Sequence, residues 1–341
     1  MFSDFYGNPE PAASLFALTH QERLPQTILL DGPDGIGKAT LVRRFAAALL
    51  GRADRIEQDD LSLPANQAIV ADREKWTADK RNDDPLLFAS HPDFVTFPPD
   101  GPLRQISIQQ MRALKEQARL NPLHGDRRVF LIDHIDRANE QAANSLLKTL
   151  EEPPPHLIVF LTAENAYDLL PTIRSRSVSF HLAPLADEEM EVFARARGLT
   201  DPRRRVALAD GSPGIAVSLD LEAYDQRRGS MLKLLEVASG RAPFSDWLKD
   251  AESISARRDK LDLYLGVLYV LLEDAMLATR NPDRIRNRDL TDRLVKLGNV
   301  VSFEWLDAAV RKVDELSGLV RRNIQKSIAL DAFAMELRRL S

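Results

Sequence analysis

One stretch near the start of the chain has the residue types and spacing that hold phosphate groups. It reads Gly32-Pro33-Asp34-Gly35-Ile36-Gly37-Lys38-Ala39-Thr40. The run matches the phosphate-binding pattern GxxxxGK(S/T) everywhere except at its last position. The three glycines would let backbone N–H groups turn toward phosphate oxygens, and the following helix would add partial positive charge at its N-terminus. Lys38 would then reach the β and γ phosphates.

The last position of this loop has lost the group that binds magnesium. A Ser or Thr there places its hydroxyl on Mg²⁺, and Ala39 has none. Thr40 lies one residue further, about 100° around the helix, so it does not substitute cleanly. We therefore expect no ATP hydrolysis by this loop, and the residues alone leave open whether a nucleotide still binds.

A second feature, the acidic residue Asp133, follows the apolar run Val129–Ile132. Asp133 comes at the end of this expected strand, where a P-loop enzyme holds its metal. Active ATPases of this kind continue with a glutamate that activates water, but this chain has His134. A strand-end aspartate that only caps a turn is the alternative interpretation. The local residues do not decide between these roles.

A third feature is a pair of arginines just before another expected strand. The segment reads Thr172-Ile173-Arg174-Ser175-Arg176-Ser177. Arginines at a sheet edge usually form surface ion pairs, which contribute little to stability. An arginine finger offered to a neighbouring subunit would instead stabilise phosphoryl-transfer charge, worth ~10³–10⁵ in rate.

Alternating strands and helices are expected to position these groups. Apolar runs predict strands at 27–30, 93–97, 129–132, 157–161 and 178–182. Residues 41–50, 106–120 and 139–152 carry helical periodicity. This alternation predicts an α/β domain with a largely parallel sheet. Residues 51–92 are polar and are expected to form an irregular insertion.

The later part of the chain has a different pattern. Strand signals fade after Pro184, short helices are expected to about residue 238, and everything from about residue 243 is expected to be helical. We therefore predict a P-loop domain at 1–183, a small helical lid at 184–239 and an all-helical C-terminal domain at 240–341.

Composition excludes several classes of protein. The 341 residues carry a net charge of −5, so the whole molecule is not a general polyanion binder. With no cysteine, disulfides and thiolate metal sites are excluded, and the six histidines lack metal-ligand spacing. No signal peptide is visible, and the longest apolar run, Leu263–Leu272, is far shorter than the ~20 residues that span a bilayer. We expect a cytoplasmic protein without a membrane partner.

Several motifs together resemble the bacterial DNA polymerase III clamp-loader subfamily of AAA+ proteins. They are His91-Pro92-Asp93, Ile106, Ile108, Gln110, Arg112, Pro122, Gly125 and the run Ala142 to Pro154. Leu170 to Ser177 resembles the family's SRC motif, with serine for cysteine. The resemblance covers about the first 220 residues and implies an AAA+ domain, a lid and a collar. The family's cysteine-bound zinc module would fall within 51–92, where no cysteine stands, so zinc is not carried over.

Departures from the family pattern imply a subunit that has lost hydrolysis. Ala39 lacks the magnesium hydroxyl, His134 replaces the catalytic glutamate, and Ile215 stands where a motor subunit places its sensor-2 arginine. The resemblance then implies a stator that offers Arg176 in trans to an adjacent ATPase. Its implied partners are the gamma/tau and delta subunits in a hetero-oligomeric ring, and indirectly the sliding clamp and primed DNA. It would need no cofactor, although ATP or ADP would bind weakly.

Two alternatives remain open from the sequence. The first is an active ATPase of the gamma/tau type, in which Thr40 holds magnesium and His134 activates water. The second is an unrelated P-loop enzyme such as a kinase. The helical second half of the chain argues against this alternative.

Overall fold

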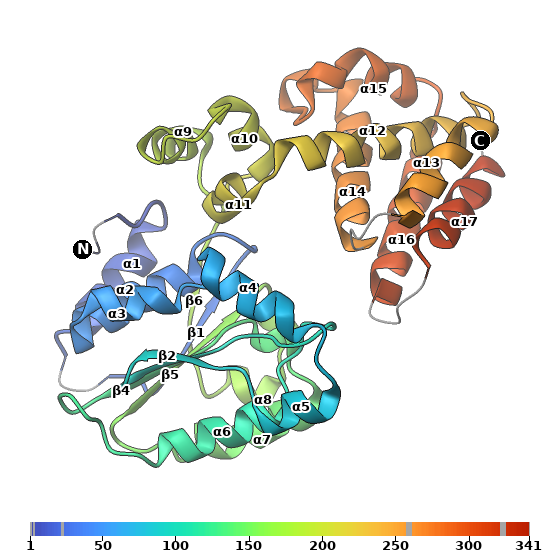
Figure 1. The fold of residues 1–341 in the computed structure, drawn as a ribbon. Coiled ribbons are helices and arrows are strands. Elements are labelled where there is room, and N and C mark those ends of the chain that lie inside the picture. The colour runs from blue at the N-terminus through green and yellow to red at the C-terminus, as the bar shows by residue number, and fades with distance from the viewer. Residues whose placement is uncertain (1, 3, 22–23, 257–260, 321–324, 341) are drawn as a thin grey trace. The chain divides into compact units, whose positions relative to one another are not determined.

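The computed structural model describes residues 2, 4–21, 24–256, 261–320 and 325–340. The chain forms two compact units (Figure 1). One comprises Met1–Pro202 with Ala209–Val217, and the other comprises Arg203–Leu208 with Ser218–Ser341. The predicted division into three domains stays a prediction.

The first unit is built on a six-stranded sheet. Its strands are β1 (Thr27–Asp31), β2 (Phe88–His91), β3 (Phe94–Phe97), β4 (Arg128–Ile132), β5 (Leu157–Ala163) and β6 (Val178–His181). They lie in the order β2-β3-β4-β5-β1-β6. All neighbours are parallel except β2, which runs antiparallel to β3. The five expected strands are present, and β2 is an additional one.

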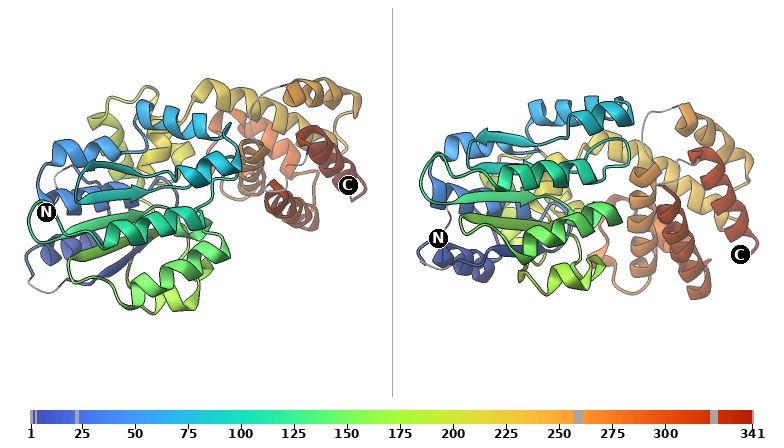
Figure 2. Two further views of the ribbon diagram at one scale, coloured as in Figure 1. Left: turned by 60° about the horizontal axis from the view of Figure 1, so that its bottom comes forward. Right: turned by 90° about the horizontal axis from the view of Figure 1, so that it is seen from below.

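Helices cover both faces of this sheet (Figures 1 and 2). On one face lies α2 (Lys38–Leu50), with α1 (Pro9–Leu18) packed beside it; on the other lie α6 (Ile108–Ala118), α7 (Glu140–Glu151) and α8 (Pro171–Arg174). Alternate strand residues point to opposite faces. Phe160 packs its ring 4.9 Å from that of Phe45 on α2, while Val159 joins the cluster under α6 and α7. The predicted α/β class with a largely parallel sheet is confirmed.

The insertion at 51–92 is more regular than expected. It contains α3 (Ala53–Ile56), the 3₁₀ turn η1 (Glu57–Asp59), α4 (Pro64–Arg73) and α5 (Ala78–Asp83) before β2. Ion pairs hold much of this insertion. The Arg43 guanidinium lies 3.0 Å from the Glu57 carboxylate and 2.6 Å from the Asp60 carboxylate. Arg73 lies 2.7 Å from Asp100, and both side chains are buried. Because charge pairs rather than a wide apolar stripe hold these helices, periodicity did not reveal them.

Short helices follow β6. They are α9 (Asp187–Ala196), α10 (Pro202–Ala209) and α11 (Pro213–Ser218). Short 3₁₀ turns also occur at η2 (Ile135–Arg137), η3 (Ala166–Asp168), η4 (Pro282–Arg284) and η5 (Arg288–Leu290). The start of α11 matters for the site, because the backbone N–H of Gly214 donates a 2.8 Å hydrogen bond to the carbonyl of Gly35.

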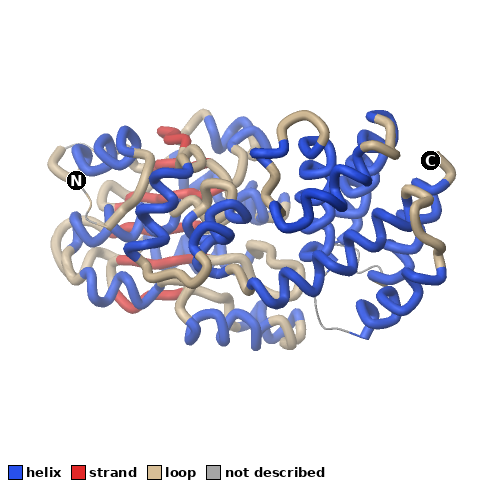
Figure 3. The backbone as a smooth tube through the Cα atoms, turned by 90° about the horizontal axis from the view of Figure 1, so that it is seen from above, coloured by secondary structure: helices blue, strands red, loops and turns tan. Residues whose placement is uncertain are grey.

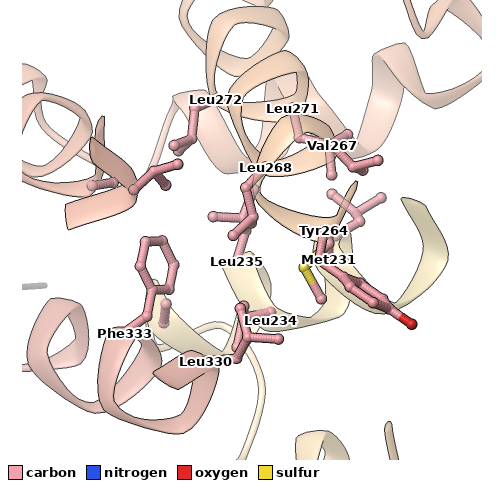
Figure 4. Close-up of a cluster of buried hydrophobic side chains, with 14 of the residues drawn as sticks. Met231, Leu234, Leu235, Tyr264, Val267, Leu268, Leu271, Leu272, Leu330 and Phe333 are labelled. Carbon is pink, nitrogen blue, oxygen red and sulfur yellow. The ribbon is translucent and has the colours of Figure 1, made fainter. Parts of the chain in front are cut away.

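The second unit is helical in its described part, and strands occur only in the first unit (Figure 3). Its helices are α12 (Leu221–Ala238), α13 (Ser245–Ala256), α14 (Leu261–Ala278), α15 (Thr291–Gly298), α16 (Phe303–Val320) and α17 (Lys326–Arg338). Leu235, Leu268 and Phe333 from α12, α14 and α17 meet in its apolar core (Figure 4). Across the described residues, no helix combines the length and apolar character that a membrane span requires. The expected all-helical C-terminal region is confirmed.

Candidate functional site

The glycine-rich loop connects β1 to α2, as the sequence predicted. Gly32 and Gly35 have φ values of 145° and 72°, which residues with a side chain rarely adopt. A Cβ on Gly32 would lie 2.2 Å from the carbonyl oxygen of Leu182, directly after β6. The loop is therefore held tightly against the neighbouring strand, and Lys38 begins the helix behind it.

Lys38 is bound by the loop that contains it. Its buried ammonium donates hydrogen bonds to the carbonyls of Gly32 at 2.6 Å and Pro33 at 2.8 Å. Burial lowers the pKa of this ammonium, although the carboxylates of Asp34 and Asp133 act in the opposite direction. To contact a phosphate, Lys38 would have to exchange these carbonyls for phosphate oxygens.

The two residues after Lys38 provide no evident magnesium ligand. Ala39 ends in a methyl group. The hydroxyl of Thr40 accepts a 3.4 Å hydrogen bond from Arg43, whose guanidinium is also paired with Glu57 and Asp60. A cation at the Thr40 hydroxyl would therefore compete with a fixed positive charge.

Asp133 follows β4 and is buried beside the loop. The Thr162 hydroxyl donates a 2.6 Å hydrogen bond to its carboxylate and accepts a 2.8 Å bond from the backbone N–H of His134. Thr162 lies on β5, which separates β4 from β1. Sequence reasoning missed Thr162. The available signal was a polar residue extending the apolar run at 157–161.

One histidine and two acidic residues lie close together near Asp133. One donor atom each from His134, Asp136 and Glu164 lies within 4.8 Å of the others. Burial raises the pKa of Asp136, and Arg137 lies 3.2 Å from Glu164. Asp136 and Glu164 were not predicted as site residues. The donor types suit a divalent cation, but here the carboxylates also counter the positive charge of Lys38.

The start of α11 closes over the tip of the loop. A Cβ on Gly35 would lie 2.9 Å from the backbone nitrogen of Ile215 and 3.0 Å from its Cγ1. The aliphatic side chain of Ile215 thus packs against the loop and brings no positive charge to it.

Arg176 lies away from all of these groups. It precedes β6, which runs parallel to β1 in a register that pairs Ile28 with Val178 and Asp31 with His181. The loop follows the end of β1, whereas Arg176 precedes the start of β6, so they lie at opposite ends of the strand pair. Five residues of strand rise about 16 Å. Arg176 therefore does not join this chain's own phosphate loop.

The surroundings of Arg176 are open. Its exposed guanidinium contacts the carboxylate of Glu151 at 2.9 Å and donates to the carbonyl of Thr172 at 3.0 Å. Nearby, the Arg174 guanidinium stacks 5.0 Å from the ring centroid of Tyr167, and that tyrosine is 82% exposed. The arginines thus form part of an accessible surface.

Comparison with known proteins bears on this arrangement. A family model described as DNA polymerase III, delta subunit, matches residues 7–186. The DNA polymerase III subunit delta' of Pseudomonas aeruginosa is 29% identical over 227 residues, which cover 64% of each chain. That of Bacillus subtilis is 25% identical over 291 residues, or 83% of this chain and 81% of the relative. The subunit tau of Salmonella typhimurium is 26% identical over 67% of this chain and 34% of its own length. The match thus spans less than two thirds of the Pseudomonas and Salmonella proteins.

Proposed function

This chain belongs to the family described as DNA polymerase III, delta subunit, and from that premise we propose that it acts as a delta-prime clamp-loader subunit. In this role it is a stator that hydrolyses no ATP itself. It joins gamma/tau and delta subunits in a hetero-oligomeric ring and provides Arg176 to the adjacent ATPase. The sliding clamp and primed DNA are reached through that assembly.

The position of Arg176 carries this proposal. An arginine finger in trans must be accessible and must lie away from its own chain's nucleotide loop. Arg176 is exposed and lies at the opposite end of the β1–β6 pair from Gly32. This position therefore suits contact with a phosphate that a neighbouring subunit binds. There the charge of Arg176 would stabilise the transition state of phosphoryl transfer.

The nucleotide loop supports the non-hydrolysing part of the proposal. Ala39 has no hydroxyl for magnesium, and the Thr40 hydroxyl is bonded to Arg43. His134 replaces the water-activating carboxylate, and Ile215 brings no positive charge to the loop. The chain would therefore need no cofactor, and a nucleotide would bind weakly because Lys38 must first leave two carbonyls.

Reconstitution tests the proposed role. The purified chain should show no steady ATP turnover, whereas a loader containing Arg176→Ala should hydrolyse ATP about 10³-fold or more slowly at the shared site. Unchanged loader turnover would reject the finger assignment. Steady turnover by the isolated chain, abolished by Lys38→Ala, would favour an active ATPase of the gamma/tau type instead.

Equilibrium binding of a fluorescent adenine nucleotide tests the state of the loop. Because Ala39 cannot ligate magnesium, the dissociation constant should be the same with and without Mg²⁺. A strong magnesium requirement would contradict this and would support a metal-bound role for Asp133.

A further inference from the structure

Arg176 is held by a specific acidic residue on a neighbouring helix. Glu151 is the last residue of α7, and its Oε1 lies 2.9 Å from Nη2 of Arg176. The two side chains remain 48% and 34% exposed, respectively. The two residues are 25 positions apart, so the contact depends on the packing of α7 against the α8–β6 segment.

The contacts of Arg176 use only part of its guanidinium. Nη2 donates to Glu151, and Nη1 donates to the Thr172 carbonyl at 3.0 Å, with the Ser175 hydroxyl 3.5 Å away. A guanidinium has five N–H donors in a rigid planar fork. The contacts on two different nitrogens therefore fix its plane. Because Ser175 takes the second Nη1–H, these contacts leave the Nε–H and one Nη2–H for an incoming anion.

Fixing the plane matters for an arginine that acts across an interface. A long arginine side chain on a surface samples many rotamers, and ordering it during the reaction lowers the rate. Catalytic groups are most effective when their geometry is set before the charge develops. The Thr172 carbonyl belongs to the same short segment as Arg176, so Glu151 is the anchor that ties the guanidinium to the body of the unit.

We propose that Glu151 is a positioning residue, which holds Arg176 in the orientation required to reach a neighbouring subunit's phosphate. This inference rests on the proposed function of Arg176. The Glu151 carboxylate acts through the guanidinium and does not itself contact the nucleotide.

The reconstituted loader provides the test, with ATP turnover measured as kcat and KM. Glu151→Ala should lower kcat by about two- to fivefold, as one exposed charge pair contributes, with KM unchanged. Glu151→Gln keeps an acceptor oxygen for Nη2 and should retain most of the wild-type kcat. The matched control is Glu152→Ala, which removes the adjacent exposed carboxylate and should have no effect. Thermal unfolding of each variant subunit should match the wild type, since both positions are exposed.

A double-mutant cycle with Arg176→Ala separates the possible failures. If Glu151 acts through Arg176, then Glu151→Ala should lower turnover no further in the Arg176→Ala background. Full turnover by Arg176→Ala itself would reject the proposed finger. Slowed turnover in Arg176→Ala, combined with unchanged or faster turnover in Glu151→Ala, would overturn only the positioning role. An additive loss in the double variant would show that Glu151 acts by another route and would also overturn it.

Discussion

Thr162 and Asp133 are joined by a buried 2.6 Å hydrogen bond between hydroxyl and carboxylate. The same hydroxyl accepts a bond from the backbone N–H of His134. One side chain on β5 thus ties down both the end of β4 and the turn after it, beside the glycine-rich loop.

Replacing Thr162 with valine tests this contact. Thr162→Val keeps the shape but leaves Asp133 and the His134 N–H without a buried partner, at a cost of about 1–3 kcal/mol in unfolding free energy. Urea unfolding measures the change. Thr162→Ser retains the hydroxyl and should lose less. Equal stability of the valine and wild-type proteins would show that this hydrogen bond is dispensable.

The tip of the phosphate loop should not tolerate a side chain. Gly35 and Gly125 have nearly the same φ, 72° and 76°, but an added Cβ would meet neighbouring atoms only at Gly35. Alanine at either position incurs the penalty of a positive φ. Gly35→Ala also forces Ile215 to move, so it should destabilise by about 1–3 kcal/mol more than Gly125→Ala. Chemical denaturation of both variants measures the difference in unfolding free energy. Equal losses would mean that the start of α11 can move away from the loop without a cost in stability.

The buried ion pair in the insertion should be essential for stability. Arg73 forms two hydrogen bonds to the Asp100 carboxylate, at 3.0 Å and 2.7 Å. Arg73→Ala would leave a buried carboxylate without its partner, which costs about 3–5 kcal/mol. Urea unfolding provides the measurement. The control is Arg52→Ala, which breaks an exposed pair with Asp54 and should leave stability within experimental error.

His91 should make stability depend on pH. Burial lowers the pKa of its imidazole, with Asp93 partly opposing, and Nδ1 accepts a 3.1 Å bond from the backbone N–H of Asp93. The folded protein therefore favours the neutral ring. Its contribution is complete above the unfolded-state pKa of about 6.5 and is lost as the pH falls through the lower folded-state pKa.

Unfolding free energies of the wild type and His91→Asn, measured between about pH 5 and pH 7.5, check this sign. The asparagine variant keeps an acceptor but cannot titrate, so its stability should fall less toward low pH. His20→Asn serves as the control, because that ring is exposed and is not among the groups that shift the pKa of His91. A wild-type protein that becomes more stable on acidification would contradict the expectation.

Local patterns in the sequence determined much of the fold. Apolar runs located β1, β3, β4, β5 and β6, and helical periodicity located α2, α6 and α7. The glycine spacing placed the phosphate loop between β1 and α2. These features depend on residues that are close in sequence, since periodicity and backbone freedom are local properties.

The helices within the insertion were hidden because ion pairs with residues distant in sequence hold them. Arg43 pairs with Glu57 and Asp60, and Arg73 pairs with Asp100, 27 residues away. A single residue's charge does not reveal its partner, so the polar composition of 51–92 was interpreted as irregular structure.

The sequence alone also identified the altered groups Ala39, His134 and Ile215, and it singled out Arg176. Only the tertiary structure decided which residues surround them. The sheet order inserts β5 between β1 and β4, which brings Thr162 to Asp133. The parallel register of β1 and β6 separates Arg176 from the loop, and helix packing brings Glu151 to it. Strand order and helix packing depend on contacts between segments far apart in the chain, which no local pattern encodes.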